Sequence, residues 1–176
     1  MDPNAEFPSV YTRPFLYEFL DYIKSVNKNN IIILWTAGTF EYISQMLLLL
    51  NLSQYFHHVL FRNHCKESQK QTGYQKSYKY LISLFPIYKY LRAILIDDAA
   101  NWNVDKYNDK INYFKIISVK PFNLKDVQRF FFKSSNNTNN NIRGDTTLLN
   151  VINYLDKNLF LSENDNSENK KIKIKK

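Results

Sequence analysis

The sequence has little of several residues and patterns that define whole classes of protein. Its single cysteine, Cys65, excludes an intramolecular disulfide and points to a reducing compartment. Glycine is also scarce, with three in 176 residues. The N-terminus has neither the basic region nor the apolar run of a signal peptide. The longest apolar runs, Ile31 to Trp35 and Met46 to Leu50, are far too short to span a bilayer. We therefore expect an intracellular protein, nuclear or cytoplasmic, without a membrane span.

What is present is the composition of a globular protein, 44% hydrophobic and 23% charged. The length suits one domain with a substantial core. The formal charge of +8 suits a phosphorylated or nucleic-acid partner. However, the basic residues are scattered, and their clearest cluster, residues 170–176, is typical of a solubilising tail. Nucleic-acid binding is therefore disfavoured.

Short apolar runs alternate with segments that have helical periodicity. Apolar residues that recur every three or four positions predict helices at residues 14–26, 41–50 and 78–85. Unbroken apolar runs predict strands at residues 31–35, 59–61, 93–96 and 114–119. The polar residues 63–76 are predicted to form a loop. This alternation favours an α/β fold with a doubly wound parallel sheet.

The domain layout follows from the same patterns and from two polar segments. Asp145 is positioned to cap a last helix. The predicted parts are a flexible N-terminus at 1–12, an α/β domain at 13–133, a disordered Asn-rich insert at 134–144, a C-terminal helix of the domain at 145–161 and a disordered basic tail at 162–176.

Polar side chains follow two of the predicted strands, at the ends where parallel sheets bind ligands. Thr36 follows the first strand, and its hydroxyl could donate to a phosphate oxygen or cap the next helix. Asp97 and Asp98 follow another strand. Adjacent carboxylates resist joint ionisation, and Mg²⁺ would remove that cost, although a solvated turn explains the same pair.

Other polar residues support weaker hypotheses. Arg62 and Lys79 could add positive charge near a phosphate, although lone basic residues are usually only solvated. The histidines and the cysteine between residues 57 and 65 lack the spacing of a closed zinc site. We identify no partner that would activate Cys65 as a nucleophile.

Five segments occur in an order that is typical of one enzyme family. They are RPFLYEFL at 13–20, ILWTA at 33–37, LFRNHC at 60–65, YKYLISL at 78–84 and ILIDD at 94–98. Together, over about Arg13 to Phe122, they resemble the motifs of the NLI-interacting-factor-like phosphatases, which act on the C-terminal domain of RNA polymerase II. That family belongs to the haloacid-dehalogenase-like superfamily.

The resemblance implies both a fold and a set of roles. The fold would be a haloacid-dehalogenase-like, doubly wound parallel sheet with flanking helices. The activity would be that of a Mg²⁺-dependent serine/threonine phosphoprotein phosphatase with an aspartate nucleophile. Thr36 and Lys79 would hold the transferred phosphoryl group, and Arg62 would contact the phosphorylated protein. Asp97 and Asp98 would hold Mg²⁺.

The chain departs from that family at the first motif, D-x-D-x-T/V, which carries the nucleophile and the general acid. The nearest string, Asp2 to Glu6, lacks the second Asp and a preceding strand. Tyr80 also stands where the family has an Asp. We therefore expect the fold to lack its N-terminal central strand, and the chain to be inactive unless that motif is supplied. The alternative is a non-catalytic interaction or assembly module, as in pseudophosphatases and a phosphatase-like protein that supports nucleocapsid assembly in insect viruses.

Overall fold

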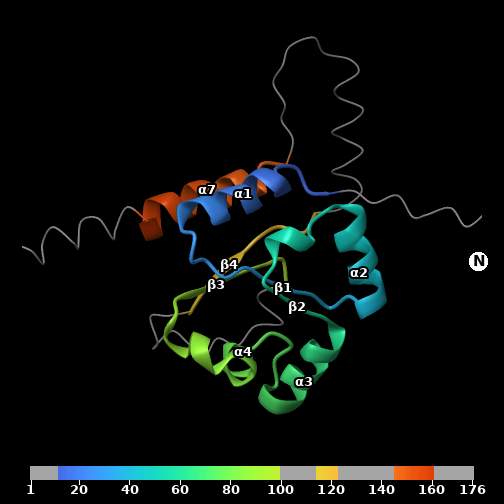
Figure 1. Cartoon of the computed structure of the whole chain (residues 1–176). Coiled ribbons are helices and arrows are strands. Elements are labelled where there is room, and N and C mark those ends of the chain that lie inside the picture. Colours follow the sequence, from blue (N-terminus) through green and yellow to red (C-terminus); the bar gives the residue numbers. More distant parts are fainter. Residues whose placement is uncertain (1–11, 100–113, 123–144, 161–176) are drawn as a thin grey trace, which may run out of the picture. The chain divides into compact units, whose positions relative to one another are not determined.

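The computed structural model describes residues 12–99, 114–122 and 145–160, which fall into two compact units (Figure 1). The larger unit is Ile23–Pro121, and the smaller unit combines Met1–Tyr22 with Phe122–Lys176. The predicted insert, the predicted tail and nearly all of the predicted N-terminal segment lie outside the described residues. The predicted domain bounds therefore stay predictions.

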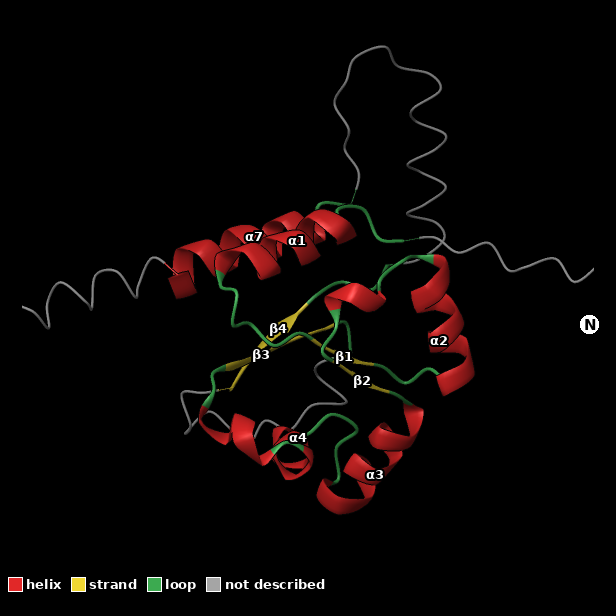
Figure 2. Ribbon diagram, in the orientation of Figure 1, coloured by secondary structure: helices red, strands yellow, loops and turns green. Residues whose placement is uncertain are grey.

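The larger unit is a mixed α/β structure with two small parallel sheets (Figure 2). Strand β1, Ile33–Trp35, pairs with β2, His58–Leu60. Strand β3, Ala93–Asp97, pairs with β4, Phe114–Ser118. The four strands occur where apolar runs predicted them, and their parallel pairing confirms the α/β class. A single doubly wound sheet stays a prediction.

Helical segments connect the parallel strands, as crossover connections require. Between β1 and β2 lie helix α2, Phe40–Leu49, and the 3₁₀ turn η1, Ser53–Tyr55. Between β2 and β3 lie helices α3, Arg62–Thr72, and α4, Tyr78–Leu84, and the 3₁₀ turn η2, Pro86–Tyr90. Among the described residues, no helix has the length and apolar character needed to cross a membrane.

The prediction of a loop at residues 63–76 was wrong, because α3 occupies most of this segment. A helix is usually recognised in a sequence by its apolar stripe. The buried residues of α3 are instead Cys65 and Ser68, which are small, and the Ser68 hydroxyl donates to the carbonyl of Tyr74 at 2.7 Å. Gly73 follows the helix in the left-handed conformation, with φ of 83°, as is common after a helix end.

The described part of the smaller unit is helical. It contains most of α1, Leu16–Val26, together with α7, Thr147–Leu155, and the π-helical turn η4, Asp156–Phe160. The N-cap residue of α7 is Thr146 rather than the predicted Asp145, which lies one residue earlier and whose Oδ1 accepts the N–H of Thr147 at 2.9 Å. Nε of Arg13 donates to Oδ2 of Asp145 at 2.7 Å, which joins the two helical segments. The buried apolar residues of this unit are Leu20, Leu148, Val151 and Leu155.

Candidate functional site

The turn after β1 is tied to the start of α3 by hydrogen bonds. The N–H of Thr36 donates to the carbonyl of Leu60 at 2.8 Å and so extends the pairing of β1 with β2. The backbone N–H of Arg62 donates to the carbonyl of Gly38 at 2.9 Å. Nε of Arg62 donates to the carbonyl of Ala37 at 2.8 Å. Two predicted site residues, Thr36 and Arg62, are therefore brought to the same turn.

The Thr36 hydroxyl belongs to this turn and does not cap α2. Its Oγ1 accepts the N–H of Gly38 at 3.1 Å, whereas α2 is capped by Thr39, whose Oγ1 accepts the N–H of Tyr42 at 3.4 Å. A hydroxyl can accept and donate together, so the Thr36 hydrogen can still serve an external acceptor. A Cβ atom at Gly38 would lie 2.7 Å from Cδ1 of Ile43, so a larger residue here would force the Ile43 side chain to move.

The last residue of β3, Asp97, is buried and paired. Its Oδ2 forms an ion pair with the ammonium of Lys76, and its Oδ1 accepts the N–H of Ala99 at 2.7 Å. The two charged side chains are only 12% and 4% exposed, for Lys76 and Asp97 respectively. A buried carboxylate without a partner is costly, and Lys76 offsets this cost.

The thiol of Cys65 connects the ends of β1 and β3. Its Sγ donates to the carbonyl of Thr36 at 3.5 Å. Burial raises the pKa of the Cys65 thiol, while the charge of Lys76 and the indole N–H of Trp35 oppose this shift and the charge of Asp97 adds to it. Lys76 and Asp97 thus lie close enough to Cys65 to act on it electrostatically. Cys65 therefore lies between the turn that follows β1, to which it is hydrogen-bonded, and the charged pair at the end of β3, which acts on it electrostatically.

Two other predicted residues are not brought into this cluster. Lys79 is exposed on α4, and within the described residues it forms no ion pair. Its neighbours Tyr78 and Tyr80 are both buried, which leaves the lysine between them facing outward. Asp98 is exposed in the turn that follows β3.

The lysine at the site, Lys76, was missed by sequence reasoning. It precedes α4 in a segment that was predicted to be a loop, and its partner Asp97 is 21 residues away. The spacing of apolar residues predicts helices and strands, but it does not predict an ion pair between residues this far apart in the sequence. The one local signal is Ser77, because serine is favoured immediately before a helix. It indicates that α4 begins after Ser77 and that Lys76 therefore lies outside the helix.

The two predicted magnesium ligands differ in their surroundings, because Asp97 is buried and Asp98 is exposed. Among the described residues, no group of three or more His, Cys, Asp or Glu side chains could hold a metal ion. Both oxygens of Asp97 are engaged, by Lys76 and by the N–H of Ala99. Mg²⁺ usually keeps several waters and is bound through one or two carboxylates, so its assignment to Asp97 and Asp98 stays a prediction.

Comparison with known proteins identifies the family. The chain matches no curated protein and no solved structure. A family model described as NLI interacting factor-like phosphatase matches residues 3–165. This range includes the Thr36 turn, Lys76 and the end of β3. Because the match covers well over half of the sequence, the chain belongs to the NLI interacting factor-like phosphatase family.

Proposed function

We propose that this phosphatase-like chain binds a phosphorylated serine or threonine of a protein partner at the ends of β1 and β3, and that it does not hydrolyse the phosphate by itself. The observation that carries this proposal is the buried ion pair between Lys76 and Asp97, which lies beside the turn formed by Thr36 and Arg62. Parallel α/β structures bind their ligands at such strand ends.

Three side chains offer donors to a phosphate at this site. The ammonium of Lys76 has three N–H donors, of which Asp97 engages one. Arg62 uses Nε for the carbonyl of Ala37, and among the described residues its exposed Nη nitrogens have no partner. The hydroxyl of Thr36 adds a neutral donor. The site thus has two cationic side chains, Lys76 and Arg62, but one buried carboxylate, that of Asp97. This excess of positive charge favours a bound anion.

The described carboxylates do not supply the chemistry of hydrolysis. A nucleophilic aspartate must reach phosphorus, and a second acid must protonate the leaving oxygen. Asp97 is buried and paired with Lys76, and the sequence contains no D-x-D string. Turnover would therefore require a first motif in addition to these residues. The family is generally magnesium-dependent, and a bound Mg²⁺ would offset the negative charge of the phosphoryl group.

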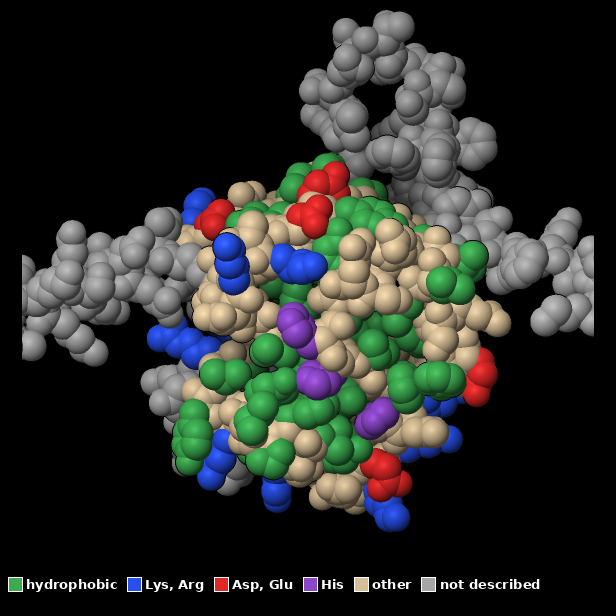
Figure 3. All heavy atoms as spheres, in the orientation of Figure 1, with side chains coloured by type: hydrophobic (Ala, Val, Ile, Leu, Met, Phe, Trp, Pro, Cys, Tyr) green, Lys and Arg blue, Asp and Glu red, His purple; other side chains and the backbone are tan. Residues whose placement is uncertain are grey.

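The second candidate function is a non-catalytic interaction or assembly module that does not recognise phosphate. Exposed apolar side chains favour it, because such surfaces are common at protein interfaces. Leu48 on α2 is 80% exposed, and Ile87 and Tyr90 on η2 are 79% and 77% exposed. Figure 3 shows apolar side chains gathered next to the histidines on one face of the molecule.

Fluorescence anisotropy with a labelled phosphoserine peptide and its unphosphorylated form tests phosphate recognition. We expect the phosphorylated peptide to bind more tightly, and Arg62→Met to weaken that binding by about tenfold, which is the loss of one charge-assisted hydrogen bond. Arg62 is exposed, so this variant should keep its fold. Lys79→Met is the matched control, since it removes one exposed positive charge away from the site and should leave the affinity unchanged.

The outcomes separate the candidate functions. Equal affinity for both peptides would refute phosphate recognition and favour the interaction module. Phosphate release from p-nitrophenyl phosphate with added Mg²⁺, measured on this chain, tests the proposed inactivity. Turnover that Asp98→Ala abolishes would show that the chain is an active phosphatase. Turnover only after a strand with D-x-D-x-T/V is added upstream would support the assignment of the site.

A further inference from the structure

Helix α3 presents a row of basic side chains to solvent. Arg62, Lys66 and Lys70 follow one another at intervals of four residues, so they lie along one side of the helix. All three are exposed, whereas Cys65 and Ser68 are on the buried side of the same helix. Within the part of the chain that the structure describes, none of the three basic residues forms an ion pair. We call this row the basic edge of α3.

One end of the basic edge lies at the turn that follows β1. Nε of Arg62 donates to the carbonyl of Ala37 at 2.8 Å, which holds the guanidinium beside this turn. Lys66 and Lys70 follow about 6 Å and about 12 Å further along the helix axis. Side chains of a helix lean toward its N-terminus, so both lysines lean toward Arg62. The basic edge therefore extends the positive charge of the proposed phosphate site along α3.

One acidic residue of α3, Glu67, is also exposed. Burial raises the pKa of Tyr80 on α4, and the charge of Glu67 adds to this shift, so Glu67 acts on the neighbouring helix. Three basic residues against this one carboxylate leave α3 with an excess of positive charge. A nucleic-acid backbone carries a charge at every nucleotide and would bring phosphates against Glu67. Separate acidic side chains can avoid it, so the basic edge suits an acidic peptide better.

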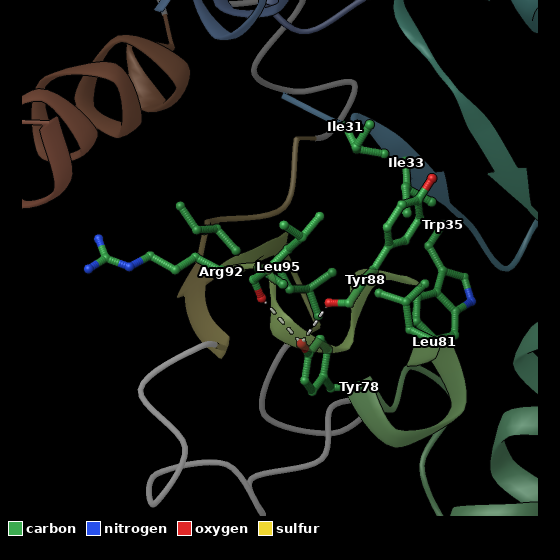
Figure 4. A pocket seen from close by; sticks show the side chains of 11 residues that line it. Ile31, Ile33, Trp35, Tyr78, Leu81, Tyr88, Arg92 and Leu95 are labelled. Atoms are coloured by element: carbon green, nitrogen blue, oxygen red, sulfur yellow. Dashed lines mark hydrogen bonds between the residues drawn. The ribbon is translucent and has the colours of Figure 1, made fainter. Parts of the chain in front are cut away.

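The pocket of the larger unit does not offer comparable charges. It has a volume of about 150 Å³ and is lined by apolar and aromatic side chains, such as those of Ile33, Trp35 and Leu81 (Figure 4). Of the residues that line it, only Arg92 is charged, and Figure 4 shows Arg92 extending away from Trp35 and Leu81. Burying an unpaired carboxylate in such a pocket is costly. Acidic side chains near the phosphate site would therefore meet their counter-charges on α3.

We infer that the basic edge of α3 binds acidic side chains at alternate positions of an extended protein segment, whose phosphorylated serine or threonine lies at Arg62. This inference rests on the proposed function, because Arg62 is the phosphate contact in both. Alternate side chains of an extended chain point to the same side and repeat about every 6.7 Å, close to the spacing of about 6 Å along the basic edge. A phosphorylated residue and acidic residues two and four positions away thus match Arg62, Lys66 and Lys70 in order.

Fluorescence anisotropy of the full chain with labelled phosphoserine peptides tests this inference. The probes carry two glutamates, placed two and four residues either before or after the phosphoserine. In the matched control peptides the same glutamates stand one and three residues away, where they point to the opposite side of an extended chain. One of the two probes should bind about fivefold more tightly than its control, which corresponds to two exposed ion pairs. This gain should shrink as the salt concentration rises, because exposed charges are screened.

Two double variants test the location of the acidic contacts. Lys66→Met combined with Lys70→Met should remove the gain in affinity that the glutamates give. Lys28→Met combined with Lys89→Met is the matched control, since it removes two exposed lysines that precede β1 and β3, at the ends of these strands opposite to the site, and it should leave the gain unchanged. Lys66→Glu combined with Lys70→Glu should reverse the preference, so that lysines at the probe positions bind more tightly than glutamates.

The outcomes separate this inference from the proposed function. Equal affinity of probes and control peptides would overturn the inference alone, provided that the phosphorylated forms still bind more tightly than the unphosphorylated ones. Equal affinity of phosphorylated and unphosphorylated forms would refute the proposed function. A gain that survives in the variant without Lys66 and Lys70 would place the acidic contacts elsewhere. Displacement of the probe by polyuridylate, as effective as by an acidic peptide of the same total charge, would assign the basic edge to nucleic acid and overturn the inference as well.

Discussion

The ammonium of Lys76 pairs with the buried carboxylate of Asp97 at the end of β3. Its charges act on the thiol of Cys65, which donates to the carbonyl of Thr36. The pair supports the proposal that Lys76 contributes to phosphate binding, whereas the predicted Lys79 is exposed on α4. It also engages the carboxylate that the family resemblance had assigned to Mg²⁺.

Replacing Lys76 should destabilise the fold strongly. Lys76→Met leaves a buried, unpaired carboxylate at Asp97, which typically costs about 3–5 kcal/mol. Lys79→Met removes the same kind of side chain from an exposed position and should change the free energy of unfolding by no more than about 0.5 kcal/mol. Urea unfolding of both variants measures the difference. Equal midpoints would contradict the buried ion pair.

Gly38→Ala should destabilise the turn that carries Thr36. The added Cβ would lie 2.7 Å from Cδ1 and 2.8 Å from Cγ1 of Ile43, which is itself buried. Such overpacking costs about 1–3 kcal/mol. Ile43→Ala removes both of these atoms, so Gly38→Ala should cost much less in that background. Additive effects in this double-mutant cycle, measured by thermal or urea unfolding, would show that the clash is not the cause.

The stability of the helical unit should depend on the charge of Asp145 at low pH. Burial raises the pKa of Asp145, but hydrogen bonds from Thr147 and Arg13 outweigh this effect and the net pKa is lowered. A carboxyl whose pKa is lowered by folding stabilises the protein above its unfolded value of about 3.9, and this contribution is lost as the pH falls through the folded pKa.

Asp145→Asn isolates this charge, because the amide oxygen can still accept the N–H of Thr147. The difference in unfolding free energy between the wild type and this variant should be constant above about pH 5 and should shrink below about pH 4. Urea titrations over this range measure it. A difference that stays the same at every pH would mean that the Asp145 charge does not stabilise the fold.

Cys65 should react slowly with thiol reagents in the folded protein. Cys65 is 3% exposed, and burial raises the pKa of its thiol, so little thiolate is present at neutral pH. Reaction with dithiobis(nitrobenzoic acid) should be at least about tenfold slower in buffer than in denaturing urea, where the thiol regains its ordinary pKa. Comparable rates under both conditions would show that the thiol is accessible in the folded chain.

Much of the fold was predictable from local patterns. Apolar runs at residues 31–35 and 93–96 predicted β1 and β3, because strands buried on both faces need consecutive apolar side chains. The positions of Thr36 and Asp97 at the ends of these strands followed directly. The order of the short motifs also predicted the family, which the match over residues 3–165 confirms.

Other features arise only when distant segments meet. Helix α3 has no apolar stripe, since its inward residues include Cys65 and Ser68, and their burial depends on partners elsewhere in the fold. The choice of Lys76 over Lys79 depends on an ion pair across 21 residues, which no local periodicity encodes. The sequence alone thus determined the strands, the residues at their ends and the family. Tertiary structure decided which lysine meets Asp97, because pairing and burial depend on neighbours that are distant in the chain.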